Sequence, residues 1–375
     1  MDNKVLVVYR VNREDPSNLG VIQKMIGFIQ GLESNNYTVD HIVSGRRDIF
    51  FNSRSIRSFH RLFPNELIQW TWFKYLENID FSQYEVIFVR YGLSTPSFIR
   101  WLDLIRTRWP RIRIVIDMPT YPYEQEWRSR ALGRLLMAFE RQKTKLLKDY
   151  VDYVLHSGDE NDIFGIPTIK MGNGITPYNK TPKRSWNPPE IRLIAVGKWN
   201  YWHGLDRIVL GLSKYVSRGG KDVYLDIIGE GPERDSIYRQ IKRNGLEDFI
   251  TLHTSMPSNE LEQYFSRATI GVGTLGLFRK GVSIDSSLKH RQYVKQGLPF
   301  IYAGMDGDIE RNESFVLNVP SDNAPIDISN IVSFVEKYDY HNGANRMDEL
   351  LRTKLSWKVK VKQICLQIGI RIETD

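Results

Sequence analysis

The sequence has a single cysteine, Cys365, and no apolar run that approaches the roughly 20 residues of a membrane-spanning helix. One cysteine excludes a disulfide within the chain and a metal site of the CxxC type. The seven histidines show no metal-ligand spacing, so we expect no metal or other cofactor. The chain starts with a short apolar strand, VLVVY, instead of the apolar core and cleavage site of a signal sequence. These absences predict a protein of a reducing compartment, the cytosol.

Negative charge is also in short supply, because 44 Asp and Glu accompany 52 Lys and Arg, which gives a net charge of +8. The excess is concentrated between Arg100 and Lys148, where twelve basic residues accompany five acidic ones. Part of this stretch, 128–148, has the apolar spacing of an amphipathic helix. Such a helix either lies on an anionic membrane surface or presents a solvated charged face, and both interpretations stay open. No nucleic-acid-binding motif accompanies the charge, so we expect no nucleic acid partner.

The chain is otherwise of ordinary globular composition, with 41% hydrophobic residues, and its 375 residues suffice for two domains of ~150 residues each. In the first half, short apolar runs alternate with amphipathic segments, which predicts a parallel sheet covered by helices on both faces. The expected strands are Lys4–Tyr9, Thr38–Val43, Val86–Arg90, Ile112–Asp117, Tyr153–His156 and Pro167–Met171. The expected helices include Leu19–Leu32, Ser97–Trp109 and the basic helix.

A stretch with four prolines and no apolar period, TPYNKTPKRSWNPP, then interrupts the pattern and is typical of a linker. A second alternating series follows, so we expect an N-terminal domain 1–175, a linker 176–190, a C-terminal domain 191–345 and a closing helical segment 346–375. The expected strands are Ile191–Gly197, Val223–Ile228, Ile250–His253, Thr269–Gly273, Phe300–Tyr302 and Phe315–Asn318. The expected helices are Gly204–Val216, Pro232–Asn244, Ser258–Arg267, Ser287–Gln296, Asp327–Tyr338 and Arg346–Leu366.

Three segments of the second half carry residue types that suit a phosphate-bearing ligand. Gly197 ends a strand, and the lysine that follows it is placed to reach a diphosphate. A second strand ends in Gly229-Glu230-Gly231-Pro232, a strand–turn–helix sequence with proline in the first helical turn. In the third segment, Ser286 or Ser287 is expected to cap a helix whose free N–H groups form an anion site. Each segment alone also fits a plain structural loop or a capped surface helix.

Together these segments resemble glycosyltransferase family 4. The matching stretches, in the order of the family pattern, are Asn173-Gly174-Ile175, Gly197-Lys198 with His203-Gly204, Gly229-Glu230-Gly231-Pro232, and Lys289 and Gln292 with Gly297-Leu298-Pro299. The segment around Ser356-Trp357 is similar to the closing helix of the family, which folds back on the N-terminal domain. The resemblance covers residues 165–365, whereas the first half is similar in architecture only.

The resemblance implies an α/β protein of the GT-B architecture. In it, two Rossmann-like, doubly wound parallel-sheet domains face each other across a cleft. The first domain is expected to bind the acceptor and the second a nucleotide sugar. The resemblance also implies that the sugar is transferred with retention of anomeric configuration and that no metal is required.

The resemblance further implies roles for residues of the second domain. Lys198 and Lys289 would stabilise the leaving diphosphate, and Gln292 would bind the ribose. The sequence departs from the family at several places. Lys198 replaces an arginine and His203 a lysine, and both of the family's paired glutamates are missing, the first near Ile284 or Asp285 and the second at Gln292. The remaining residues expected at the donor site are Gly197, Gly229, Glu230, Ser255, Ser287 and Leu288.

One segment of the first half, DMPTYPYEQE, follows a strand and is similar to a segment of polysaccharide-assembling transferases. Its prolines stiffen the loop, and its two tyrosines offer flat faces to a sugar. We expect Asp117 and Glu124 to contact acceptor hydroxyls. A rigid loop that only packs against its neighbours is the alternative, and it stays open.

Two other strings are expected to carry no function. The GxGxxG sequence at 271–276 is not followed at once by a clear helix, so a dinucleotide site is not expected. Asp306-Gly307-Asp308 matches the DxD motif of metal-dependent transferases, yet its context predicts a solvated turn.

The sequence therefore predicts a retaining, metal-independent transferase in cell-surface polysaccharide synthesis, such as that of a capsule or exopolysaccharide. A UDP sugar is the favoured donor, and a glycan or lipid-linked glycan is the expected acceptor. The enzyme is expected in the cytoplasm, with peripheral contact to the inner membrane face through the basic helix. A sugar-nucleotide epimerase of the same architecture, or a sugar-nucleotide-binding protein with weak turnover, is the alternative.

Overall fold

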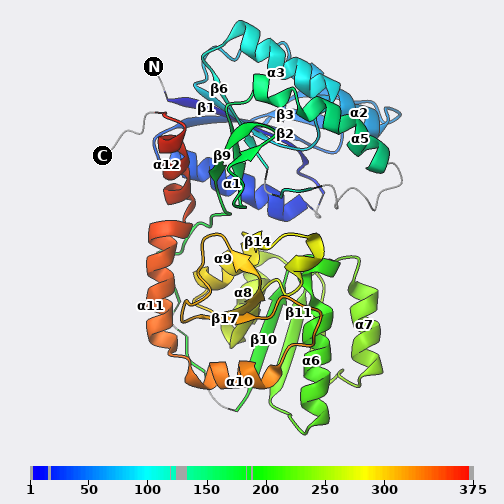
Figure 1. The fold of residues 1–375 in the computed structure, drawn as a ribbon, viewed down its shortest axis with the longest axis vertical. Coiled ribbons are helices and arrows are strands. Elements are labelled where there is room, and N and C mark those ends of the chain that lie inside the picture. The colour runs from blue at the N-terminus through cyan, green and yellow to red at the C-terminus, as the bar shows by residue number, and fades with distance from the viewer. Residues whose placement is uncertain are drawn as a thin grey trace. The chain divides into compact units, whose positions relative to one another are not determined.

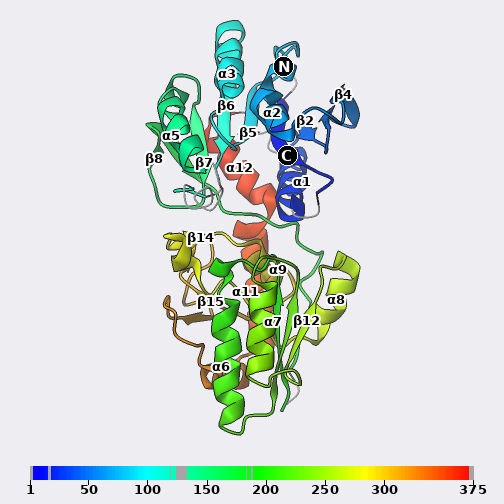
Figure 2. The same ribbon diagram turned by 90° about the vertical axis from the view of Figure 1, so that its right-hand side faces the viewer.

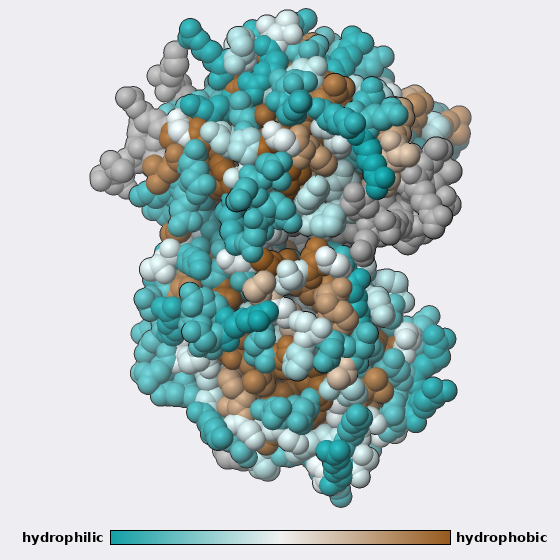
Figure 3. Space-filling view, in the orientation of Figure 1, coloured by the Kyte–Doolittle hydropathy of each residue, from teal (hydrophilic) through white to brown (hydrophobic). Residues whose placement is uncertain are grey.

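A computed structural model describes residues 3–15, 18–118, 120–123, 133–182, 184–186 and 189–370 (Figure 1). The chain forms two compact units. Unit 1 consists of Met1–Gly174 together with Trp357–Asp375, and unit 2 of Ile175–Ser356. On both units, polar and charged side chains cover most of the face that Figure 3 shows, and smaller hydrophobic patches lie among these side chains.

Unit 1 is built on a nine-stranded sheet in the order β4-β3-β2-β1-β5-β6-β7-β9-β8. The six strands from β2 to β9 are parallel and correspond to the six strands expected from the apolar runs. The hairpin of β3 and β4 and the short β8 extend the two edges in antiparallel orientation, and the sequence patterns did not predict them. The strands are β1 Lys4–Asn12, β2 Thr38–Ser44, β3 Asp48–Phe51, β4 Arg54–Ser58, β5 Val86–Arg90, β6 Arg113–Asp117, β7 Tyr153–His156, β8 Asp162–Ile163 and β9 Ile166–Lys170.

Helices cover both faces of this sheet because its central strands are apolar on both sides. In β1, Leu6 and Val8 belong to the core under α2, η2 and α3, whereas Val5 and Val7 belong to the core under α1 and α12. The helices are α1 Leu19–Glu33, α2 Asn65–Thr71, the 3-10 helix η2 Trp72–Leu76, α3 Pro96–Arg108, α5 Gly133–Thr144, the 3-10 helix η3 Leu147–Asp149 and α12 Trp357–Gln367.

The end of the chain returns to unit 1 and packs on α1, beside which α12 lies (Figure 1). The indole of Trp357 occupies space that a side chain at Gly27 or Gly174 would fill, since a Cβ at Gly27 would lie 2.0 Å from Trp357 Nε1. Asn35 of the α1–β2 turn donates a hydrogen bond of 2.9 Å to the carbonyl of Lys358. The absence of a side chain at Gly27 and at Gly174 therefore makes room for Trp357 at the start of α12.

The single closing helix expected over 346–366 is wrong in detail. The structure has α11, Tyr340–Leu350, which continues as a π-helical turn, η6 Leu351–Leu355. Ser356 then adopts an extended conformation with φ −67° and ψ 145°, which ends the helix before α12 begins. This break separates unit 2, which contains α11, from the return of the chain to unit 1.

Unit 2 contains a six-stranded, fully parallel sheet in the order β12-β11-β10-β13-β15-β17. All six strands lie where the apolar runs predicted them. A separate parallel pair, β14 and β16, lies outside this sheet. The strands are β10 Ile191–Val196, β11 Val223–Ile228, β12 Ile250–His253, β13 Ile270–Val272, β14 Ile284–Asp285, β15 Phe300–Ala303, β16 Met305–Asp306 and β17 Val316–Val319.

The helices of unit 2 also divide between the two faces of their sheet. One core lies under α6, α7 and α10, and the other under α8, α9 and α11. Figure 2 shows α6 and α7 side by side in front of the sheet. The helices are the 3-10 helix η4 Tyr201–His203, α6 Leu205–Ser217, α7 Arg234–Arg243, α8 Ser258–Arg267, the 3-10 helix η5 Leu277–Lys280, α9 Leu288–Lys295 and α10 Ile328–Lys337.

The stretch expected as a linker, 176–190, lies within unit 2. Arg184 donates hydrogen bonds to the carbonyls of Gln296 and Phe265, and Thr181 binds the Asp348 carboxylate through its N–H and hydroxyl groups. These contacts attach the proline-rich stretch to unit 2, which its composition did not predict. None of the helices in the described ranges is both long and apolar enough to cross a membrane.

Candidate functional site

The carboxyl edge of the unit 2 sheet is formed by glycines at the ends of β10 and β11. Gly197 and Gly229 have φ angles of 127° and 140°, which favour glycine. A Cβ at Gly229 would lie 2.0 Å from the carbonyl oxygen of Gly197, so the two loops approach as closely as backbones allow. The N–H of Gly197 donates to Ile228 at 3.0 Å. Glycine at both positions leaves this edge open to a ligand.

Trp199 anchors the two loops to each other and is buried. Its N–H donates to the Glu230 carbonyl at 2.9 Å, and its carbonyl accepts from the Glu233 N–H at 3.1 Å. A Cβ at Gly231 would lie 2.4 Å from the same carbonyl. This packing leaves Lys198 and Glu230 exposed on the surface of the edge, with the Glu230 carboxylate 3.6 Å from Arg234.

Lys289 lies in the first turn of α9, close to this edge. Its Cε is 4.0 Å from the position of a Cβ at Gly197, so its side chain lies beside the first glycine loop. Burial lowers the pKa of Lys289 to about 8, although the nearby Asp285 carboxylate opposes this shift. No ion pair neutralises this lysine among the residues that the structure describes, so an anion is the complementary ligand.

His203 lies near enough to Lys289 for their electrostatic interaction to be felt. Burial, and then the positive charge of Lys289, lower the pKa of His203 well below its usual value. The ring is therefore neutral at pH 7. Gly204 follows with φ 67°, and a side chain there would meet the backbone of Gly276 at 2.7 Å.

The remaining residues that were expected at the donor site have less definite contacts. Ser287, one of the two expected caps, is the N-cap of α9 by position, although its hydroxyl makes no capping hydrogen bond. Leu288 and Gln292 are half-buried in α9, and Ser255 is exposed in the loop after β12. The structure thus brings Gly197, Gly229, His203 and Lys289 together and leaves Ser255 apart.

The sequence Asp306-Gly307-Asp308 is not a solvated turn, which corrects the expectation. The Asp306 side chain is fully buried and accepts hydrogen bonds from His290, at 2.9 Å, and from Arg291, which also binds Asp308. The two carboxylates raise the pKa of Arg291 despite its burial, and Arg291 and His290 hold the pKa of Asp306 well below its usual range although burial opposes this. Both carboxylates are therefore engaged by a cation of α9.

His290 extends this network to the end of β13. Its Nε2 accepts a hydrogen bond of 3.3 Å from the Thr274 N–H, which leaves Nδ1 to donate to Asp306. The GxGxxG glycines serve this packing, because a Cβ at Gly273 would lie 2.5 Å from His290 Nε2, and one at Gly271 would lie 2.7 Å from the Tyr293 ring. The glycines thus admit the side chains of α9 over β13, which accounts for them without a dinucleotide.

Asp117, at the end of β6 in unit 1, is the centre of a buried charge cluster. Its two carboxylate oxygens accept hydrogen bonds from Lys24 and Arg90, each at 2.8 Å, and one of them also accepts from Tyr9. Burial alone would raise its pKa, but the two cations outweigh this and lower the pKa to about 2. Glu124, the other residue expected at the acceptor, lies outside the described residues.

The tyrosines of the DMPTYPYEQE segment pack against other rings of unit 1. Tyr121 makes edge-to-face contacts with His156 and Phe164, and Tyr123 makes them with Tyr91 and Phe164. Both tyrosines are half-buried. Both rings therefore pack at the carboxyl edge where β5 and β6 end, which is compatible with either expected role of the segment.

The basic helix is shorter than expected, because α5 ends at Thr144 and a separate turn, η3, follows. Phe139 is 41% exposed and Leu146 is 36% exposed, although an amphipathic helix would bury its apolar positions, whereas Met137, Glu140 and Thr144 are buried. The part 128–132 lies outside the described residues. The Glu140 side chain therefore points into unit 1. Glu140 follows Met137 by three residues and precedes Thr144 by four, so the three residues share one face of the helix, a spacing that the sequence analysis did not use.

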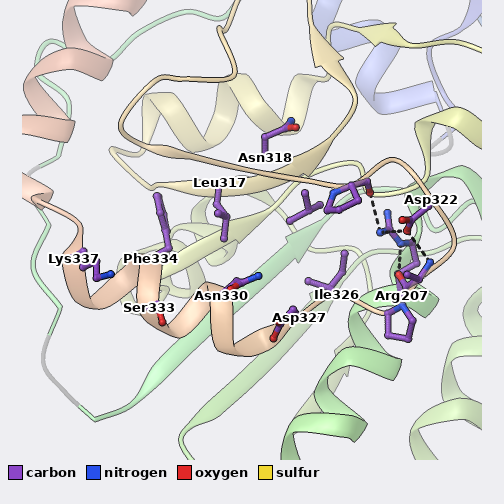
Figure 4. A pocket seen from close by; sticks show the side chains of 14 residues that line it. Arg207, Leu317, Asn318, Asp322, Ile326, Asp327, Asn330, Ser333, Phe334 and Lys337 are labelled. Atoms are coloured by element: carbon purple, nitrogen blue, oxygen red, sulfur yellow. Dashed lines mark hydrogen bonds and ion pairs between the residues drawn. The ribbon is translucent and has the colours of Figure 1, made fainter.

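A cavity of about 380 Å³ lies elsewhere in unit 2, between β17 and α10. Leu317 and Phe334 point into it, and Arg207 lies at its end (Figure 4). Arg207 donates to the carbonyls of Ala324 and Pro320 and to the Asp322 carboxylate, so its charge shapes the loop after β17. None of the expected site residues lines this cavity. Among the residues that the structure describes, no cluster of three or more metal-binding side chains occurs.

We predict that Asp306→Asn lowers the free energy of unfolding by about 3 kcal/mol, because it leaves part of a buried cation uncompensated. Urea unfolding followed by circular dichroism measures the change. The matched control is Asp322→Asn, which also removes a carboxylate from a buried arginine. That carboxylate is 54% exposed and Arg207 keeps its carbonyl partners, so we expect a loss below about 1 kcal/mol. Equal losses in the two variants would contradict the prediction.

No protein-family model and no curated protein sequence matches the chain. Solved structures match over nearly its whole length. The catalytic domain of starch synthase IV from Arabidopsis thaliana, bound to ADP and acarbose, is 10% identical, with a TM-score of 0.62 over 97% of this chain and 98% of that one. A glycosyltransferase from Rickettsia africae is 13% identical, with a TM-score of 0.60 over 98% and 97%. Anabaena HepE in complex with UDP is 12% identical, with a TM-score of 0.57 over 98% and 99%. The chain has the GT-B fold of these glycosyltransferases.

Proposed function

We propose that the protein transfers a glycosyl group from a nucleotide sugar, with a UDP sugar favoured, to a glycan or lipid-linked glycan. The observation that carries this proposal is Lys289, a half-buried cation without an ion-pair partner in the described residues, at the N-terminus of α9 and beside the glycine loops after β10 and β11. A lysine, free N–H groups and close backbone approach together suit a diphosphate. Similar structures with bound UDP and ADP support the choice of ligand.

In this proposal Lys289 and the first turn of α9 stabilise the negative charge that develops on the leaving diphosphate. Lys198, exposed on the β10 loop, supplies a second cation. His203 is neutral and contributes a hydrogen bond, so it does not replace the charge of the family's lysine. Gln292, one turn after Lys289, is assigned to the ribose, to which it can donate and accept hydrogen bonds without charge.

Transfer with retention is the stereochemistry that we propose, since the resemblance to family 4 implies it. The acceptor hydroxyl would attack from the side that the diphosphate leaves. Positioning and charge stabilisation then supply most of the rate, and no protein nucleophile is assigned. Glu124 keeps its proposed role at the acceptor. For Asp117 we propose a positioning role instead, because Lys24 and Arg90 already occupy both of its carboxylate oxygens.

The proposed setting is cell-surface polysaccharide synthesis in the cytoplasm, at the inner face of a membrane. The support is chemical: Arg141, Lys145 and Lys148 are exposed in and after α5, and Phe139 and Leu146 are exposed beside them. Such a mixture of basic and apolar side chains suits an anionic lipid surface.

We predict that Lys289→Ala lowers kcat/KM for transfer by about 10²–10³-fold, the usual size for one contact to transition-state charge. Because the pKa of Lys289 is about 8, its charge is present below that pH and is lost above it. Wild-type transfer should therefore decline from pH 7 to 9, and Lys289→Arg should remove the decline. Initial rates with a panel of UDP, GDP and ADP sugars and glycan acceptors measure both effects. Consumption of a nucleotide sugar without an acceptor would point to the epimerase instead.

A second prediction concerns metal. Two lysines and the helix N-terminus supply positive charge to the diphosphate, and Asp306 and Asp308 are engaged by Arg291. We therefore expect transfer to persist in EDTA, measured as initial rate before and after chelation. Loss of activity that manganese restores would refute this part of the proposal.

A third prediction concerns the membrane. Each basic residue near an anionic surface adds about 1 kcal/mol, and the attraction fades as the Debye length falls to ~3 Å at 1 M salt. Sedimentation with phosphatidylglycerol-containing vesicles should show binding at low salt that Arg141→Glu with Lys145→Glu weakens. The control is Lys242→Glu with Arg243→Glu, the same change of charge on exposed positions of α7. Equal weakening by both pairs, or no binding by the wild type, would leave the basic residues of α5 as a solvated face.

A further inference from the structure

A second arrangement of charges, at the carboxyl edge of the unit 1 sheet, is left incomplete by the protein itself. Glu140 of α5 is 3% exposed. Its Oε1 accepts hydrogen bonds from the Tyr91 hydroxyl, at 2.5 Å, and from the Ser94 N–H, at 3.2 Å. Its Oε2 is buried and makes no hydrogen bond with any residue in the described ranges. A buried carboxylate oxygen without a hydrogen bond raises the free energy of the folded protein, so it indicates a partner that is not part of the chain.

Arg10, near the end of β1, is the complementary group. One guanidinium nitrogen donates to the Gln69 carbonyl at 2.8 Å, and the guanidinium lies over the Phe73 ring. Burial lowers the pKa of Arg10 to about 10, and the charges of Tyr91 and Glu140 oppose the shift, so Arg10 and Glu140 interact electrostatically. They nevertheless form no ion pair. Gln69 on one side and Tyr91 with Ser94 on the other hold the two charges apart.

Aromatic rings surround this pair. Tyr91 contacts Tyr123 at 5.7 Å and Phe164 at 6.4 Å between ring centroids, and Tyr123 contacts Phe164 at 6.5 Å. The Tyr123 hydroxyl lies near enough to lower the pKa of Glu140, although burial dominates and raises it. Such rings suit the apolar faces of a pyranose. Tyr123 itself is half-buried.

We propose that Arg10 and Glu140 select a neutral sugar as the acceptor, with Glu140 accepting a hydrogen bond from a sugar hydroxyl and Arg10 donating one to the same or the adjacent hydroxyl. A hydroxyl both donates and accepts, so vicinal hydroxyls complete both groups at once. An ammonium group would be attracted by Glu140 but repelled by Arg10, and a carboxylate or phosphate the reverse, so a neutral hydroxyl is the group that interacts favourably with both. That the bound sugar is the acceptor rests on the proposed function, whereas binding of a neutral sugar at this site does not require transfer.

The test measures binding to the full chain without turnover. Affinities for methyl glucoside and methyl galactoside, and for their 2-amino and uronic acid counterparts, are obtained by saturation-transfer NMR titration. UDP affinity is measured separately by calorimetry. We expect the wild type to prefer the neutral glycosides. Glu140→Gln, which places a donor where Oε2 accepts, should weaken neutral glycoside binding about tenfold and improve binding of the uronic acids relative to the neutral sugars. Arg10→Gln should shift the preference toward the amino sugars.

The control variant is Glu160→Gln, a glutamate of unit 1 that binds His156 at 2.8 Å. It should leave every affinity unchanged, and UDP affinity should stay within twofold of wild type in all variants. Structural damage would weaken the binding of all glycosides in parallel, and that result would overturn the proposal. So would a wild-type protein that binds no neutral glycoside or that prefers the charged ones. Failure to bind UDP would refute the proposed function instead, so the two failures are distinct.

Discussion

The buried guanidinium of Arg291 is the charge on which the arrangement of unit 2 depends. It is completely inaccessible to water, so it must be neutralised where it lies, and Asp306 and Asp308 do this from the segment after β15. The same Asp306 holds His290, which in turn binds the backbone after β13. One ion-pair network thereby ties α9 to the ends of two strands. It fixes the first turn of that helix, and with it Lys289, beside the glycine loops.

Unit 1 has a similar buried ion-pair network in which the central group is an anion instead of a cation. There a buried anion, Asp117, forms ion pairs with both Lys24 and Arg90 at the carboxyl edge of the sheet. In each unit a cluster of paired charges holds the edge in place. Beside it lies a charge that has no ion-pair partner among the described residues: Lys289 in unit 2 and Glu140, with Arg10, in unit 1. The closed clusters confer rigidity. The open charges are where we propose that ligands bind, because a ligand of opposite charge or a hydrogen-bonding ligand would compensate them.

Sequence patterns were sufficient for the parallel strands because both faces of such strands are buried and their apolar runs are conspicuous. They failed at β4, Arg54–Ser58, in which every residue is exposed and no alternation marks a strand. They failed again at Ser356, where one backbone conformation divides a continuous helical pattern between two units. Motifs were sufficient to find Gly197, Gly229 and Lys289, because the two glycines follow expected strands and the lysine lies at the start of an expected helix. The partners of Asp306 could not, because Arg291 precedes it by a strand and a loop.

The contrast between Lys289 and Arg291, two residues apart in one helix, shows why such partners decide function. The pKa of Arg291 is raised because two carboxylates outweigh its burial, whereas that of Lys289 is lowered to about 8 because Asp285 does not. Desolvating a cation without a close counter-ion costs free energy in the empty protein. An anionic ligand would remove that cost on binding, so under the proposed function this desolvation would contribute to affinity for the diphosphate. The sequence shows two basic residues of equal charge, and only their three-dimensional surroundings distinguish the structural one from the one that awaits a ligand.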